Sequence, residues 1–127
     1  MNALYRGDTM KAILVALFLA VGLAGPVAAG PLEDANAAYN KGDYATALRL
    51  VRPLADQGNA LAQSNLGFMY ANGQGVPQDY VQAHKWLNLA AAAGDQSAFK
   101  SRDIVAGKMT PAQIAEAQKL AREWKPK

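Results

Sequence analysis

Cysteine is absent from this chain, and its absence excludes several kinds of chemistry. None of the 127 residues is a cysteine, which excludes disulfide bonds, thiolate metal sites and cysteine nucleophiles. A lipoprotein anchor is excluded too, because acylation of a bacterial export signal requires a cysteine at the cleavage site. Any function must therefore come from other side chains on one small fold.

Histidine is nearly absent, since His84 is the only one. Four residues before and after it lie Tyr80 and Asn88, which form neither a two-histidine metal pair nor a histidine–carboxylate relay. The nearest carboxylate in sequence, Asp79, is better interpreted as a helix cap. We therefore interpret His84 as a surface residue of a helix, and we expect no catalytic residue, no metal ion and no cofactor.

A strong charge of one sign is also missing. The formal net charge is +3, and the N-terminal segment contributes Arg6, Asp8 and Lys11 to it. So weak a field gives no reason to expect a nucleic-acid partner. The basic residues near the C-terminus suit the negative end of a helix dipole and are interpreted as a solvated helix end: they are Lys119, Arg122, Lys125 and Lys127.

The N-terminal segment has the layout of a secretory signal peptide. Lys11 precedes an apolar run from Ala12 to Ala24, which is shorter than the roughly 20 residues that a membrane-spanning helix needs. Small residues at positions 27–29 then suit a signal peptidase, so we expect residues 1–29 to be removed after Ala29 and the protein to be periplasmic or secreted. Met10 is a better start than Met1, because residues 1–9 add nothing that an export signal requires. The alternative is an uncleaved signal, and only then would the protein be bound to a membrane.

The rest of the chain, residues 30–127, contains a repeat of 36 residues. We expect units over residues 31–57, 58–94 and 95–127. Five matches share one spacing: Asp43-Tyr44 with Asp79-Tyr80, Ala47 with Ala83, Ala55 with Ala91, Gly58 with Gly94, and Ala62 with Ala98.

Each unit is predicted to contain two helices joined by a turn. Asp79 can cap a helix that Gly94 ends, and Thr110 followed by Pro111 is typical of the start of a last, capping helix. The glycine-rich segment at residues 73–76 lacks the lysine and hydroxyl residue of a phosphate-binding loop, so no nucleotide site is expected. The pattern predicts an all-α protein: a short α-solenoid of antiparallel helix pairs with five or six helices after removal of the signal.

Residues 58–95 closely resemble the Sel1-like repeat, a relative of the tetratricopeptide repeat. Residues 31–57 lack the Gly-x-Gly-Val loop of that family and look more like a plain tetratricopeptide unit, while residues 96–125 diverge after the entry alanine. The motif positions are Leu66, Gly67, Tyr70, Gly73, Gly75, Val76, Asp79, Ala83, Trp86, Ala90 and Ala91.

The resemblance implies a scaffold whose first helices line a concave groove for a partner. Positions that the motif leaves free are expected to face this groove, although Phe68 could instead belong to the core. The candidate groove residues are Glu33, Asn40, Lys41, Leu61, Ser64, Phe68, Asn72 and Lys100.

The sequence leaves three functions open. The first is an exported, non-catalytic scaffold or adaptor that binds a protein or peptide. The second is a cell-envelope hydrolase, but the Sel1-like proteins that have been proposed to do such chemistry are rich in paired cysteines. The third is a module that binds peptidoglycan or another carbohydrate without catalysis.

Overall fold

The computed structural model describes residues 30–127, and this part of the chain is all helical. No residue from 30 onward lies in a β-strand, so the predicted all-α fold with five or six helices is confirmed. The six helices are α2 (Pro31–Asn40), α3 (Tyr44–Asp56), α4 (Ala60–Asn72), α5 (Tyr80–Ala92), α6 (Gln96–Ala106) and α7 (Pro111–Glu123).

The predicted signal peptide lies outside the described residues. This applies to its cleavage after Ala29 and to the preferred start at Met10 as well. From Gly30 to the C-terminus, no helix is both long and apolar enough to cross a membrane.

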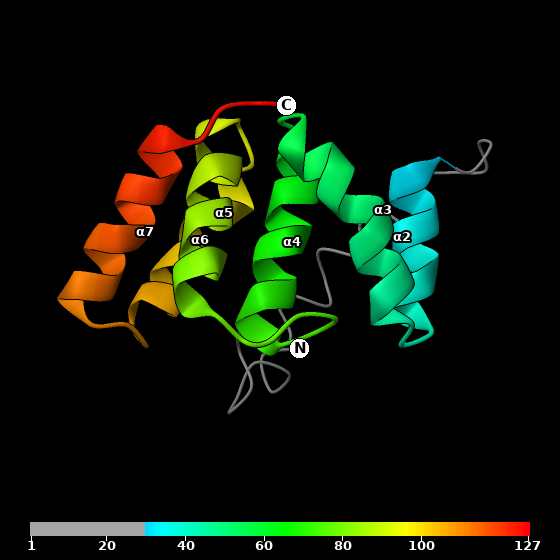
Figure 1. The fold of residues 1–127 in the computed structure, drawn as a ribbon, viewed down its shortest axis with the longest axis horizontal. Coiled ribbons are helices and arrows are strands. Elements are labelled where there is room, and N and C mark those ends of the chain that lie inside the picture. Colours follow the sequence, from blue (N-terminus) through cyan, green and yellow to red (C-terminus); the bar gives the residue numbers. More distant parts are fainter. Residues whose placement is uncertain (1–29) are drawn as a thin grey trace.

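The helices form an elongated row in which α2 and α3 lie at one end and α7 lies at the other (Figure 1). Helix α3 packs against α2 and α4, and α5 packs against α4, α6 and α7. After α7 the chain turns back across the row (Figure 1), and the amide of Lys127 donates a hydrogen bond to the carbonyl of Asp56 at 2.8 Å. The last residues thus connect the final helix to the end of α3.

Side-chain caps set where most helices begin. The carboxylate of Asp79 accepts a hydrogen bond from the amide of Gln82 at 3.1 Å, and Thr110 forms a capping box with Gln113 in front of Pro111. Both caps were predicted from the sequence and are confirmed. Helix α5 ends at Ala92, and Gly94 follows with a positive φ of 109°, as expected for a residue that ends a helix.

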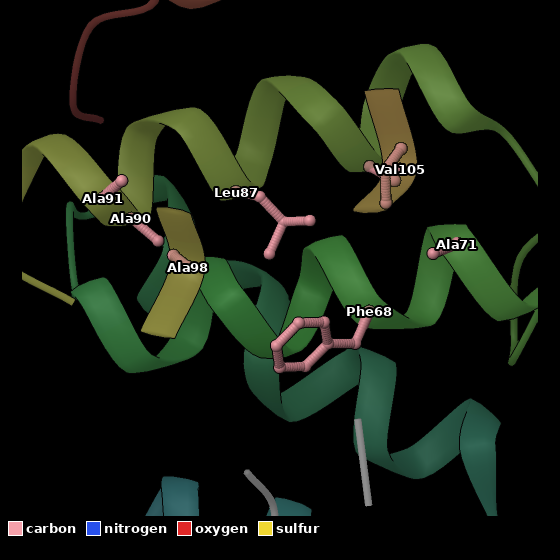
Figure 2. Packing of buried hydrophobic residues seen from close by; sticks show 8 residues of the cluster. Phe68, Ala71, Leu87, Ala90, Ala91, Ala98 and Val105 are labelled. Atoms are coloured by element: carbon pink, nitrogen blue, oxygen red, sulfur yellow. The ribbon is translucent and has the colours of Figure 1, made fainter. Parts of the chain in front are cut away.

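Small residues let the helices of the central pair pack closely. At Gly67 an added Cβ would lie 2.8 Å from Cγ of Leu87 and 3.2 Å from the carbonyl oxygen of Ala83. Because helix α5 occupies that space, any larger side chain at position 67 would push α4 and α5 apart. The buried cluster between α4, α5 and α6 contains Phe68, Leu87 and Val105 (Figure 2).

The loop between α4 and α5 links neighbouring helix pairs. Its Gln74 accepts a hydrogen bond from the hydroxyl of Tyr39 in α2 at 3.0 Å. Gly75 has a φ of 77°, and a Cβ there would lie 2.8 Å from the carbonyl oxygen of Tyr44 in α3. The Gly-x-Gly-Val loop, which has no counterpart in the first unit, therefore packs against the helices of that unit.

Candidate partner-binding surface

The eight predicted groove residues do not form one continuous open surface. Ser64 and Phe68 are buried, and Glu33 and Asn72 are half-buried. The exposed ones are Asn40, Lys41, Leu61 and Lys100.

Phe68 belongs to the core. Its exposed fraction is 0%, and it lies in the cluster with Leu87 and Val105 (Figure 2). The groove assignment for Phe68 was therefore wrong and the core alternative is correct. Helical periodicity could not decide between them, because every residue of α4 from Ala62 to Met69 is buried.

Ser64 connects two helices and does not line an open surface. Its hydroxyl donates a hydrogen bond to the carboxylate of Asp95 at 2.5 Å, and Asp95 also accepts from the amide of Ser97 as the N-cap of α6. The expectation that Ser64 faces an open groove was therefore wrong. This bond holds the start of α6 against α4.

Glu33 and Asn72 have local surroundings that the repeat pattern did not indicate. The carboxylate of Glu33 accepts a hydrogen bond from the amide of Gly30 at 2.9 Å, so Glu33 fixes the first turn of α2. The side-chain nitrogen of Asn72 is buried and has no hydrogen-bond partner within residues 30–127. Asn40 and Lys41 are exposed where α2 ends.

Leu61 and Lys100 are exposed on the first helices of two consecutive pairs. Leu61 lies in the first turn of α4 with 38% of its surface exposed. Lys100 lies in the first half of α6, whose start is held against α4 by the Ser64–Asp95 hydrogen bond. Each of these two predicted residues therefore lies within two turns of the Ser64–Asp95 hydrogen bond along its own helix.

Phe99, which precedes Lys100, was not among the predicted groove residues. Phe99 is 46% exposed, and the structure gives only Leu61 and Phe99 as large exposed hydrophobic residues in the part it describes. The guanidinium carbon of Arg102 lies 5.3 Å from the centroid of the Phe99 ring. A signal was present, because the helical neighbours of Phe99 are polar or charged and cannot form an apolar stripe with it: they are Asp95, Gln96, Arg102 and Asp103.

His84 is buried, which corrects its interpretation as a surface residue. Only 3% of it is exposed, and its Nδ1 atom has no hydrogen-bond partner in the described helices. Burial lowers the pKa of His84, the nearby Arg102 lowers it further, and Asp103 opposes them. The side chain therefore favours the neutral form.

No cluster of metal-ligating side chains is formed within residues 30–127. This region contains no group of three or more histidine, cysteine, aspartate or glutamate side chains able to hold a metal ion. The amides of Asn36 and Asn65 are buried without hydrogen-bond partners among the same residues, which costs free energy. Sequence patterning did not single out either amide.

In a comparison with known families, residues 60–95 match the family model of the Sel1 repeat. This span begins with α4 and ends at Asp95, the cap of α6. Sel1 repeats generally mediate protein–protein interactions and are typically non-catalytic. The comparisons with curated proteins and with solved structures each gave no match.

Proposed function

We propose that this chain, which carries a Sel1 repeat at residues 60–95, is an exported, non-catalytic adaptor that binds a protein or peptide partner. The Sel1 repeat is the observation that carries the proposal. Its motif residues Leu66, Gly67 and Trp86 are buried between helices, so they serve folding. The exposed side chains around the repeat then remain to make contacts.

The proposed contact surface consists of Leu61, Phe99 and Lys100, which we call the first-helix surface. It combines two exposed apolar side chains with a cation. Aromatic residues such as phenylalanine are enriched at protein–protein interfaces. Because the surface spans α4 and α6, it uses the stacking of helix pairs.

Export is the second part of the proposal, and it is supported by the signal-like pattern of residues 1–29. Mass spectrometry of the protein isolated from its own cells is expected to find Gly30 as the first residue. A protein that keeps its N-terminal segment in those cells would contradict cleavage.

Capture of a partner from envelope extract tests the surface. Lys100→Glu reverses an exposed charge on the first-helix surface, whereas Lys119→Glu reverses another exposed charge, on α7. Both variants should keep the stability of the parent within about 0.5 kcal/mol. The first should reduce capture about tenfold, which requires a loss of only about 1.4 kcal/mol of binding free energy.

The Lys119→Glu variant should capture the partner as well as the parent does. If both variants captured equally, the first-helix surface would not be the binding site. Binding to purified peptidoglycan in place of a protein would favour the carbohydrate-binding alternative.

A further inference from the structure

A second charged surface lies on the second helices of the first two pairs. One stripe of α3 lines an open cavity of about 430 Å³, formed by Ala45, Leu48, Arg49, Arg52, Pro53 and Asp56. The spacing of three and four residues puts these side chains on one side of the helix. The cavity therefore has an apolar floor flanked by two guanidinium groups.

The cations at this cavity form no ion pair closer than 4 Å within residues 30–127, and Asp43 near Arg49 and Asp56 near Lys85 interact with them only at longer range. Within residues 30–127 the structure has one ion pair closer than 4 Å, and it joins Arg102 to Asp103. Arg52 instead donates a hydrogen bond to the hydroxyl of Tyr70 at 2.7 Å, and its guanidinium carbon lies 5.9 Å from the centroid of that ring. Asp56, one turn beyond Arg52, forms no ion pair with it.

Lys85 of α5 does not line the cavity but lies close enough to Arg52 and Asp56, which do, to interact with their charges. Its ammonium lies 4.3 Å from the centroid of the Trp86 ring. Burial lowers the pKa of Lys85, and the positive charges of Arg52 and Lys127 lower it further, whereas Asp56 raises it. The charged groups around the cavity therefore act electrostatically on the Lys85 ammonium. The aromatic contacts of Arg52 and Lys85 hold both cations in place before any anion arrives.

We infer that Arg49, Arg52 and Lys85 bind a carboxylate side chain from a short acidic segment of a protein partner. Planar guanidinium groups match the geometry of a carboxylate and bind it through paired hydrogen bonds. The apolar floor of Ala45, Leu48 and Pro53 accommodates an aliphatic neighbour of the acidic residue. We call Arg49, Arg52 and Lys85 the α3 cation site.

The charge pattern favours a protein over an extended polyanion. Asp56 lies at the end of the same stripe, seven residues from Arg49, which is about 10 Å along the helix. A continuous chain of phosphates following α3 would meet this carboxylate and be repelled. A short segment can place its acid toward Arg49, at the end of the stripe away from Asp56, and so meets less of this repulsion.

Two blocked peptides that differ only in charge test the inference. One has the sequence Ala-Leu-Glu-Glu-Leu-Ala, and the other has glutamine in place of both glutamates. Titrated into the purified protein, the acidic peptide should shift the side-chain resonances of Arg49 and Arg52. Its affinity should exceed that of the glutamine peptide at least about fivefold and should weaken as salt rises from about 20 to 200 mM.

Matched variants locate the binding. Arg49→Gln and Lys85→Gln should each weaken the acidic peptide several-fold, whereas Lys119→Gln, at an exposed lysine of α7, should not. Thermal melting shows that each variant is folded. In the parent, the bound carboxylate should raise the pKa of Lys85, which the lysine resonance reports.

Four results would overturn the inference: equal binding of the two peptides, unchanged binding in folded Arg49→Gln, tighter binding of inorganic phosphate at the same site, or occupation of the site by a second copy of this chain in sedimentation. The inference is independent of the first-helix surface, since Lys100→Glu should leave peptide binding unchanged. Failure of one proposal therefore leaves the other standing.

Discussion

His84 illustrates how burial governs a single side chain in this protein. It is 3% exposed, its Nδ1 atom lacks a partner in the described helices, and burial holds its pKa below the usual value of 6.5. In the unfolded chain the imidazole regains its usual pKa, so unfolding binds a proton below that pH. The contribution of His84 to stability is therefore fully present above about pH 6.5 and is lost as the pH falls toward its folded pKa.

The variant His84→Gln should remove this pH dependence. Urea unfolding of the parent and the variant at about pH 7.5 and about pH 5 should show that acid reduces the free energy of unfolding more in the parent. Carboxylates lower stability in acid in both proteins, so the informative quantity is the difference between the two. If the difference in unfolding free energy between the parent and His84→Gln were the same at both pH values, the role assigned to His84 would be contradicted.

At the scale of the residue, the helix caps could be predicted from the sequence, whereas the burial of several individual side chains could not. The caps Asp79 and Thr110 depend on side chains a few positions away, so the sequence was sufficient. The interior positions of Ser64, Phe68 and His84 depend on which helices pack over them, and the repeat pattern does not contain that information.

At the scale of the element, the loop between α4 and α5 is the feature with the clearest tertiary role. Gly75 combines a positive φ of 77° with a Cβ direction that points at the carbonyl oxygen of Tyr44, 2.8 Å away. Gly42 has a similar φ of 80°, but no atom lies within 4 Å of its added Cβ. Comparing substitutions at the two glycines therefore distinguishes the cost of backbone strain, which both share, from the cost of a steric clash, which only Gly75 has.

Gly75→Ala should therefore destabilise the protein more than Gly42→Ala. Both substitutions carry the cost of a left-handed conformation, about 1 to 2 kcal/mol, and only Gly75→Ala adds a clash that displaces the loop from α3. Thermal or urea unfolding measures the difference directly. Equal losses would show that the contact with Tyr44 contributes nothing to stability.

Element boundaries could be read from the chain more fully than element packing. The spacing of 36 residues and the turn residues predicted the all-helical architecture. The repeat pattern did not specify the packing of α7 against α5. Nor did it specify the edge-on contact of Trp124 with Trp86, whose ring centroids lie 6.3 Å apart. They join residues far apart in sequence, in the unit where the repeat pattern diverges.

At the scale of the whole molecule, the residues that pack the helices together differ from those proposed to contact a partner. The motif positions are used between helices, while Leu61, Phe99 and Lys100 are exposed on α4 and α6. Of the predicted site, Leu61 and Lys100 remain in the proposed surface, Ser64 and Phe68 leave it, and Phe99 joins it. In the proposed function, the solenoid would present these exposed side chains to a partner.

Site-specific photo-crosslinking in living cells tests this account most directly. A photoreactive residue replaces Leu61, Phe99 or Gln118, of which Gln118 is an exposed control on α7. The account predicts a covalent adduct with the same partner protein from positions 61 and 99 and none from position 118. An adduct from position 118 alone, in a protein that is exported and folded, would contradict it.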